Sequence, residues 1–500
     1  MKLDKLMKNR KLLLILILIL AIGLRFYNIT EIGIDQWDEG EYLDAAESFL
    51  EGKWQWLGIG LKPLHNAGLV MGILLFGNYD YSGFIVTAAL GVLTVLIVYF
   101  LGKEFFDEKT GLLAAFILAI MEYHIYFSRA LFSDVTSTFF VSMTILLYFI
   151  SVKKASKMFA LLAGIFASLC FLVRINAIAV VFIILFAELI FAIRDKAFFD
   201  KKIFKERFAR FLIIFSVVCV FCFSVFNAYL FFAPSNLVEV QFGINTGQAG
   251  LSLDYGTFYL EQLVILGSPI LLLAFLLGVF KGFESRKNGD IILLIWSLSI
   301  LIFFSLYGFK RYRIFMMALP AIAILASRGL FMLKNINFKK IGNKLFLVAV
   351  LLLAITSLYA SYDTVASSST AYRDAAEFVR LDGGQGVIVS QLGIFQYYSN
   401  EKPLPVVFFD NLNSSEIKLE KLYNEGYSHL ILDYRALQYN ELAHKIVNSF
   451  EPAKKIDNTA TLFDPAIANP GLIEDFEEMR KNEIYHYVYV YRLADLMESI

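Results

Sequence analysis

The sequence contains little of what usually identifies a soluble enzyme. Its three cysteines, Cys170, Cys219 and Cys222, all lie in apolar runs and form neither a disulfide framework nor a Cys–His metal pattern. Basic and acidic residues number 45 each, so no net charge favours nucleic acid or an anionic surface. The HExxH, Walker A, GxSxG and dinucleotide-binding motifs do not occur, the single CxxC, Cys219–Cys222, lies inside an apolar run, and no internal repeat or low-complexity region is evident.

Apolar residues are abundant instead. They make up 58% of the 500 residues, against roughly 45–50% in soluble domains, and the mean hydropathy is +0.63. We therefore expect a polytopic α-helical membrane protein with about eleven transmembrane helices. The segments that carry this expectation lie near residues 12–27, 83–102, 111–128, 135–152, 158–173, 175–193, 209–233, 262–280, 290–308, 313–332 and 345–361.

Two apolar segments differ from the other candidate spans. The first is followed by "RFYNIT" and not by a small-residue cleavage site, which favours an uncleaved membrane helix over a signal peptide. The run at 67–77, "AGLVMGILLFG", is too short to span and is expected to lie in the interface or to re-enter the membrane.

Lysine and arginine gather in alternate loops, which predicts that those loops are cytoplasmic. The N-terminus then lies in the cytoplasm, and the long first loop, 28–82, lies on the extracytoplasmic side. Residues 1–361 are predicted to form the transmembrane domain. Residues 362–500 are predicted to form a small extracytoplasmic α/β domain, because helical and strand patterns alternate there. Its strand candidates are "GVIVS", "LPVVFF", "HLILDY" and "YHYVYVYRL", and its helix candidates are "TAYRDAAEFVR", "SSEIKLEKLYNEG" and "NELAHKIVNSF".

The densest acidic stretch is "IDQWDEGEYLDAA", in the first external loop. Asp38 and Glu39 stand directly before the helical pattern "EYLDAAESFL", whose Tyr42 faces its apolar side, and Gly40 permits a tight turn between them. A partly desolvated carboxylate at an interface acts as a general base, but such acids also cap interfacial helices. For Asp35, Glu41 and Asp44 we favour solvation and capping; for the Asp38–Glu39 pair both interpretations stay open.

Further charges lie on the same predicted side. Arg129 and Asp134 separate two apolar helices, and either they function together or they pair to cap the helix ends, with Asp134 as an N-cap. Arg174 stands between two apolar runs and must face the protein interior, an interface or a bound anion.

A compact basic cluster, Lys310, Arg311 and Arg313, breaks the positive-inside trend, which favours a phosphate partner over lipid headgroups. Lys62 is a further external cation. His65 is a metal ligand or, more commonly for a single histidine, a hydrogen-bonded structural residue. Acids and cations on one face suit the displacement of a phosphate leaving group by a hydroxyl, and the membrane frame suits a lipid-linked donor.

These residues resemble those of GT-C membrane glycosyltransferases, in particular the branch of protein O-mannosyltransferases and aminoarabinose transferases. The resemblance covers roughly Leu13 to Leu333. It rests on "WDEGEYLDAA", on "KPL" at Lys62, on "SRALFSD" ending at Asp134, and on "KRYRIFMMALP", where Arg313 is the closest match.

The resemblance implies an inverting hexosyl- or pentosyltransferase that uses a polyisoprenyl-phosphate sugar. Asp38 would be the base, Glu39 would shape the site, Asp134 would line the acceptor or donor pocket, and Lys62, Arg129 and Arg313 would contact phosphate. This sequence departs from the pattern: "KPL" lacks a second proline, Ile314 follows Arg313 in place of tyrosine, and the histidines that support a metal in some relatives have no counterparts. A divalent metal, Mg²⁺ or Mn²⁺, stays open, as does the acceptor, which is a protein, lipid or glycan hydroxyl.

Three other functions compete with this one. An oligosaccharyltransferase of the same broad fold would carry a "WWD" element in its soluble domain, but all four tryptophans precede residue 362. A transporter or flippase for a lipid-linked anionic glycan would show paired repeats, broken helices and charges deep within its spans. A non-catalytic lipid- or sugar-binding membrane protein would leave the combination of acids and cations unexplained.

Overall fold

The computed structural model describes residues 9–52, 62–196, 200–232, 256–265, 268–306, 312–334, 339–366, 370–390, 392–399, 406–408, 416–459 and 473–499. The chain divides into two compact units. The first comprises residues 1–27, 57–68 and 84–366, and the second comprises residues 28–56, 69–83 and 367–500. The sequence divided the chain near residue 361, whereas the second unit also takes in most of the first loop.

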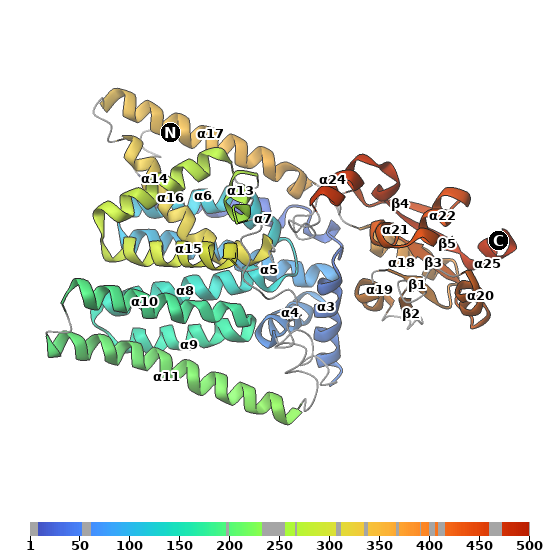
Figure 1. The fold of residues 1–500 in the computed structure, drawn as a ribbon, viewed down its shortest axis with the longest axis horizontal. Helices are drawn as coiled ribbons and strands as arrows, with labels where there is room; N and C mark the ends of the chain where they lie inside the picture. The colour runs from blue at the N-terminus through green and yellow to red at the C-terminus, as the bar shows by residue number, and fades with distance from the viewer. Residues whose placement is uncertain are drawn as a thin grey trace. The chain divides into compact units, whose positions relative to one another are not determined.

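Long helices build the first unit and run side by side (Figure 1). Their bounds are α2 Arg10–Phe26, α5 Asp80–Phe105, α6 Glu108–Ile120, α7 Glu122–Ser128, α8 Ser133–Lys154, α9 Lys157–Val173, α10 Ala179–Arg194, α11 Lys201–Phe232, α13 Phe258–Ile265, α14 Pro269–Ser285, α15 Asn288–Leu306, α16 Leu319–Lys334 and α17 Lys339–Ala366. Within the described part of the chain, eight helices are long and apolar enough to cross a membrane, and up to ten if each of two bent pairs counts as one span.

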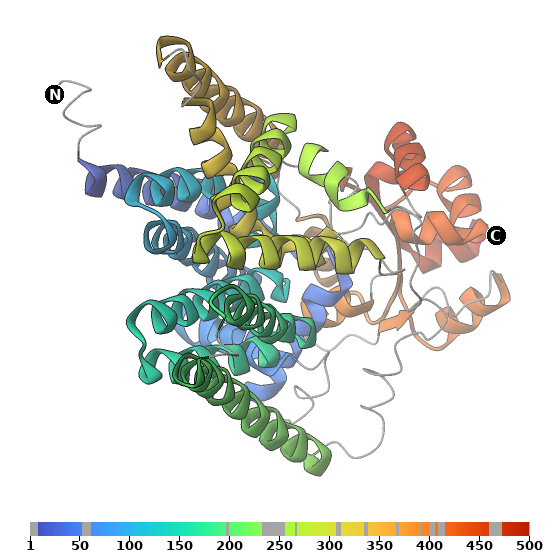
Figure 2. The same ribbon diagram turned by 60° about the vertical axis from the view of Figure 1, so that its left-hand side comes forward.

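The packing of these helices uses small residues at close crossings. A Cβ atom added to Gly278 of α14 would collide with the carbonyl of Leu325 in α16, and one added to Gly329 would collide with the carbonyl of Ala274. Small residues allow such backbone approach between membrane helices. In the same unit α9 packs between α8 and α11 (Figure 2).

Three of the expected spans differ in detail. The segment predicted at 262–280 falls on two helices, α13 and α14. The segment predicted at 111–128 is two helices, α6 and α7, with a bend of 64° between them. The short apolar run expected at 67–77 belongs to α4, Pro63–Phe76, a helix of 14 residues. The segment predicted at 158–173 is α9, whose 17 residues place it among the shorter apolar helices.

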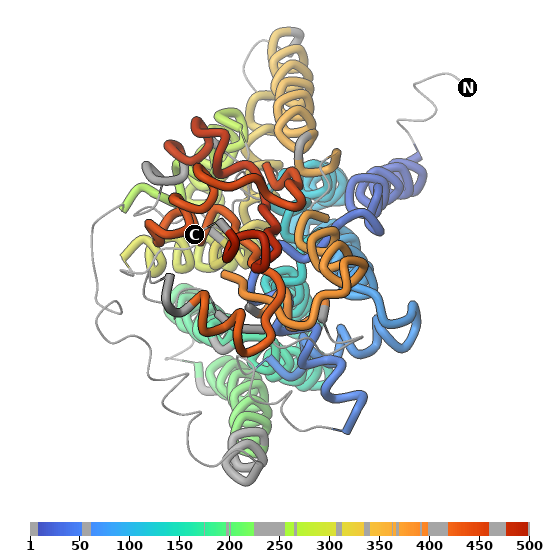
Figure 3. Tube along the Cα trace, turned by 90° about the vertical axis from the view of Figure 1, so that its right-hand side faces the viewer, coloured from blue at the N-terminus to red at the C-terminus, as the bar shows by residue number. Residues whose placement is uncertain are grey.

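The second unit contains a five-stranded sheet of order β2-β1-β3-β5-β4 (Figure 1). In the tube of Figure 3 the chain of this unit that follows α17 is coloured from orange to red. Strands β1 (Val387–Val389), β2 (Val406–Phe408) and β3 (His429–Leu432) are parallel, and β5 (Tyr487–Arg492) and β4 (Lys454–Asp457) continue the sheet antiparallel. Its helices are α3 Trp37–Leu50, α18 Ala371–Leu381, α19 Leu392–Ser399, α20 Glu416–Asn424, α21 Tyr434–Tyr439, α22 Glu441–Ser449, α24 Ile473–Lys481 and α25 Leu493–Ser499.

The predicted α/β character of the tail is confirmed, because all four strand candidates and all three helix candidates form. The central strands β1 and β3 are entirely buried, as their continuous apolar sequences require. Strand β4 escaped prediction because "KKID" is mostly exposed at the sheet edge, where lysines are common.

An ion cluster joins α18 to the last strand. Arg492 donates from Nε and Nη2 to the carboxylate of Asp382, both at 2.5 Å, and His429 Nε2 lies 3.0 Å from the same carboxylate. The Arg492 hydrogen bonds lower the pKa of Asp382 to about 2. Burial, partly offset by Asp382, lowers the pKa of His429.

Both shifts make the second unit less stable in acid. Each folded-state pKa lies below the unfolded value, so each contribution is full above that value, about 6.5 for His429 and 3.8 for Asp382, and is lost as the pH falls. We expect the unfolding temperature of this unit, followed by scanning calorimetry of the whole chain, to fall between pH 6.5 and pH 2. Asp382→Asn should flatten the fall below pH 4, and an unchanged profile in that variant would contradict the assignment.

Candidate active site

The acidic pair begins helix α3. This helix starts at Trp37, four residues before the helical pattern in the sequence, so Asp38 and Glu39 occupy its first turn and Gly40 is helical. The carboxylate of Glu39 accepts the backbone N–H groups of Asp35 and Gln36, both at 3.3 Å. This is the reciprocal arrangement of a capping box, which fixes where the helix starts. Glu39 is 1% exposed and its contacts are those of a residue that shapes the loop backbone.

Asp38 differs from its neighbour in position and exposure. It is half-buried at the second position of α3, where the positive end of the helix dipole favours a carboxylate. Glu41, by contrast, accepts a hydrogen bond from Trp37 Nε1 at 2.6 Å, and Tyr42 is buried at 3% exposure. Asp38 therefore remains the candidate base of this stretch, while a substrate contact by Tyr42, a further candidate from the same stretch, stays a prediction.

Gly40 has a packing role in place of the expected turn. A Cβ atom there would collide with the carbonyl of Gly393 in α19, so glycine lets α3 pack directly on that helix. The Arg435 guanidinium lies 5.4 Å from the Trp37 ring. These contacts hold the start of α3 within the second unit.

In the first unit, Asp134 pairs with Arg174. Arg174 Nη1 donates to Asp134 Oδ1 across the ends of α8 and α9. Arg129 is therefore not the partner, and the alternative in which Arg129 and Asp134 pair as a cap is wrong. Asp134 is also not the N-cap of α8, because Phe132 occupies that position.

The other oxygen of Asp134 lacks a protein donor. Asp134 is 2% exposed, and within the described ranges its Oδ2 has no hydrogen-bond partner, as is also true of the buried Oγ of Ser133. Buried polar atoms without a hydrogen-bond partner are rare in folded proteins, so each one needs a physical explanation. An unsatisfied acceptor oxygen is suited to bind a hydroxyl-bearing ligand.

His65 is held on both sides of its ring. Nε2 lies 2.8 Å from the carbonyl of Leu131, and Nδ1 lies 3.2 Å from Thr136 Oγ1. At 2% exposure, the ring ties α4 to the start of α8, which matches the structural alternative for this residue. Lys62 is half-buried directly before α4, and its predicted phosphate contact stays a prediction.

Arg129 binds backbone carbonyls. Its guanidinium donates to the carbonyls of Tyr27 at 2.7 Å, Arg25 at 3.3 Å and Val365 at 3.4 Å, and the residue is 4% exposed. The first two bonds satisfy carbonyls at the C-terminal end of α2, and the third satisfies one in the last turn of α17. Its predicted phosphate contact would have to share this guanidinium with them.

Only one member of the predicted basic cluster lies within the described residues. Arg313 lies in the 3₁₀ segment Tyr312–Ala318, is 9% exposed, and stacks its guanidinium 5.0 Å from the centroid of Phe132. Phe132 directly precedes α8, so Arg313 packs next to the helix that carries Asp134. Lys310 and Arg311 lie outside the described residues.

Sequence reasoning missed Arg25. This fully buried residue of α2 donates to the carbonyls of Leu118 and Ala119 and approaches His124 Nδ1 at 2.8 Å. The two carbonyls lie at the end of α6, where the bend leaves them without helical partners. Arg25 therefore stabilises the break between α6 and α7. The missed signal was an arginine at the end of an apolar span, which is costly unless it has partners.

The described residues do not provide a cluster of metal ligands. Among the residues the structure describes, no three His, Cys, Asp or Glu side chains are grouped as metal ligands. A divalent metal, Mg²⁺ or Mn²⁺, stays an open possibility from the sequence.

A family model matches the first unit of the chain. Residues 63–221 match the model described as dolichyl-phosphate-mannose-protein mannosyltransferase. This range contains the break at α6–α7, the Asp134–Arg174 pair and His65. Among curated protein sequences none matches significantly.

Solved structures match over most of the chain. ArnT from Cupriavidus metallidurans in the apo state is 14% identical over 96% of this chain and 97% of its own, with a TM-score of 0.63. The same protein bound to undecaprenyl phosphate matches with a TM-score of 0.61 over the same shares and at the same identity. The Archaeoglobus fulgidus oligosaccharyltransferase AglB, in complex with an inhibitory peptide and a dolichol-phosphate, is 14% identical over 86% of this chain and 70% of its own, with a TM-score of 0.57.

These matches establish the fold. The chain is an integral membrane protein with the GT-C glycosyltransferase fold and a small C-terminal α/β domain, as the resemblance implied. The family match and the fold together support glycosyl transfer from a lipid-linked sugar.

Proposed function

We propose that the chain is an inverting glycosyltransferase that moves a sugar from a polyisoprenyl-phosphate donor to a hydroxyl acceptor on the extracytoplasmic side. The observation that carries this proposal is the family match at 63–221, on a GT-C fold, over the segment that holds the buried Asp134–Arg174 pair. Relatives of the same fold bound to undecaprenyl phosphate and to a dolichol-phosphate support the donor class.

The proposed reaction is a single displacement. Asp38 takes the proton of the acceptor hydroxyl, whose oxygen attacks the anomeric carbon while the bond from that carbon to the phosphate oxygen breaks. Polyisoprenyl phosphate leaves with the bonding electrons, and cationic side chains stabilise its developing charge. One displacement inverts the anomeric configuration. Arg174, Arg313 and Lys62 are the candidates for the cationic role.

The test uses the purified full chain in detergent with radiolabelled sugars on polyprenyl phosphate. Mannosyl, glucosyl and aminoarabinosyl donors are offered with a membrane extract as acceptor, and matching nucleotide sugars serve as controls. We expect label in the acceptor and free polyprenyl phosphate only with a lipid donor; EDTA, Mg²⁺ and Mn²⁺ arms test the metal. Transfer from nucleotide sugars would contradict the proposal, and movement of intact donor across proteoliposomes without cleavage would favour a flippase.

The topology is part of the same proposal. Lysine and arginine in alternate loops support a cytoplasmic N-terminus and an extracytoplasmic C-terminal domain. A cysteine replacing the exposed Tyr439, in a chain freed of its own cysteines, should react with an impermeant maleimide in intact cells. Labelling only after lysis would reverse the topology.

A further inference from the structure

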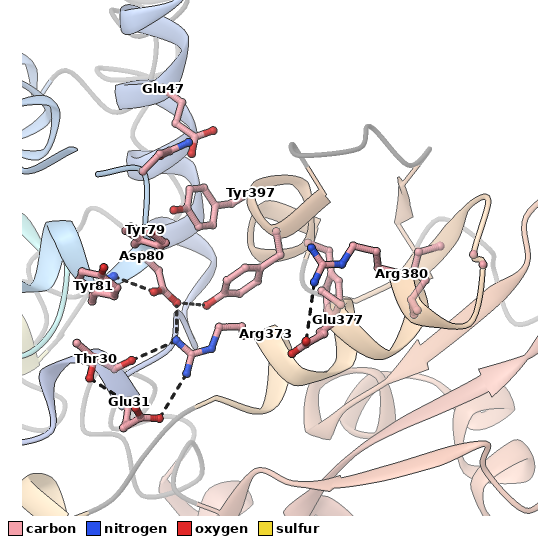
Figure 4. Close-up of a pocket in the computed structure, with 18 of the residues that line it drawn as sticks. Thr30, Glu31, Glu47, Tyr79, Asp80, Tyr81, Arg373, Glu377, Arg380 and Tyr397 are labelled. Atoms are coloured by element: carbon pink, nitrogen blue, oxygen red, sulfur yellow. Dashed lines mark hydrogen bonds and ion pairs between the residues drawn. The ribbon is translucent and has the colours of Figure 1, made fainter. Parts of the chain in front are cut away.

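The second unit contains a pocket that takes no part in the proposed chemistry. Its volume is about 750 Å³, and every residue that lines it belongs to this unit (Figure 4). The walls come from the 3₁₀ turn Ile29–Glu31, from α3, from the start of α5 and from α18 and α19. A pocket of this size matches those that hold small ligands, about 300–1,000 Å³.

The charge of the pocket disfavours the lipid phosphate as its ligand. Five carboxylates and two guanidinium groups line it, a formal excess of three negative charges. They are Glu31, Glu47, Glu51, Asp80 and Glu377, with Arg373 and Arg380. Such a surface repels a phosphate and favours a neutral or amino-bearing molecule that offers hydrogen-bond donors.

Tyrosine rings supply flat apolar faces beside these charges. Tyr79 is 54% exposed and stacks on Tyr81, with ring centroids 4.8 Å apart and planes within 10°. Tyr397 from α19 also lines the pocket (Figure 4). A stacked pair is a rigid platform with an apolar body and a polar tip, which suits the C–H face of a sugar ring while neighbouring carboxylates accept its hydroxyl protons.

One wall is held rigid by a hydrogen-bond network. Arg373 Nη1 donates to the carbonyl of Thr30 at 3.2 Å and lies 3.5 Å from Asp80 Oδ2. The hydroxyl of Tyr398 donates to the same oxygen at 2.8 Å and accepts the N–H of Ile34 at 3.0 Å. Burial holds the pKa of Tyr398 well above its usual value, so this hydroxyl keeps its proton. A pre-formed wall lowers the entropy cost of binding.

We propose that this pocket is a saccharide-binding site, for a neutral or amino-substituted glycan of about two or three rings. The pocket offers both hydrogen-bond acceptors and donors around an aromatic platform, and this combination favours a polyhydroxyl ligand. A basic peptide would need only the acidic groups. The site binds sugar without a lipid phosphate and without the proposed base, so its occupancy is separable from glycosyl transfer.

Saturation-transfer NMR on the full chain tests this proposal, in a detergent without a sugar headgroup so that the detergent does not compete. The probes are maltotriose, tri-N-acetylchitotriose and the trisaccharide of glucosamine, with trilysine as the peptide comparator. We expect at least one trisaccharide to bind saturably, with affinity reduced about fivefold or more by Tyr79→Ala. Tyr439→Ala, at an exposed tyrosine away from the pocket, should leave binding unchanged.

A second variant, Glu377→Gln, keeps the shape of the pocket and removes one charge-assisted acceptor, so it should also weaken sugar binding. The thermal unfolding of each variant checks that the chain folds. Saturable binding by none of the sugars, undiminished binding in both pocket variants, or binding of trilysine alone would each overturn the saccharide assignment.

Discussion

Asp38→Asn should reduce transfer from a polyprenyl-phosphate sugar by about 10²–10⁴-fold, the usual contribution of a general base. The amide is nearly the same size as the carboxylate, but it cannot take the proton of the acceptor hydroxyl. Asp38 is half-buried in the first turn of α3, and the substitution keeps the size of its side chain there. The measurement is the initial rate with labelled lipid donor, together with the thermal unfolding of the variant.

Two variants on the same helix make this test specific. Asp44→Asn, also half-buried on α3, should keep the rate of the wild type, because it lies beyond the first turn. Glu39→Gln should loosen the capping box and lower the unfolding temperature as well as the rate. A rate near that of the wild type in folded Asp38→Asn would show that the base is another residue.

The tail could be predicted element by element because its signals are local. Asn440 caps α22 by accepting the N–H of Leu442 at 2.9 Å. The alternating tyrosine and valine residues of "YVYVY" produce β5. The membrane helices were equally visible, since length and apolarity alone identify a span. Structure that a segment of ten to twenty residues encodes by itself could therefore be predicted from the sequence.

What the sequence could not reveal depends on partners far along the chain. The break between α6 and α7 contains neither proline nor glycine, and it is stabilised by Arg25, more than ninety positions away from Leu118 and Ala119. Likewise α3 packs on α19 through Gly40 and Gly393, which no local pattern links. Asp134 looked like the partner of nearby Arg129, but its ion pair reaches across to Arg174, 40 positions on.

The Asp134–Arg174 pair allows a second strong prediction. Asp134→Asn should lower the rate of transfer at least about 10²-fold, because the substitution removes the carboxylate that we expect to line the acceptor or donor pocket. It should also destabilise the first unit by about 3 kcal/mol, because Arg174, whose side chain is 13% exposed, then keeps a largely buried charge without its counter-ion. Transfer assays and thermal unfolding in one detergent measure the two effects separately.

The double variant Asp134→Asn/Arg174→Gln decides between a functional and a structural role. Removing both charges relieves the uncompensated guanidinium, so most of the lost stability should return, a coupling typical of residues in direct contact. Activity should stay low, because the free oxygen of Asp134, Oδ2, is absent from both variants. If the rate returned together with stability, the pair would serve only to join α8 to α9, and the ligand-binding role of Asp134 would fall to another residue.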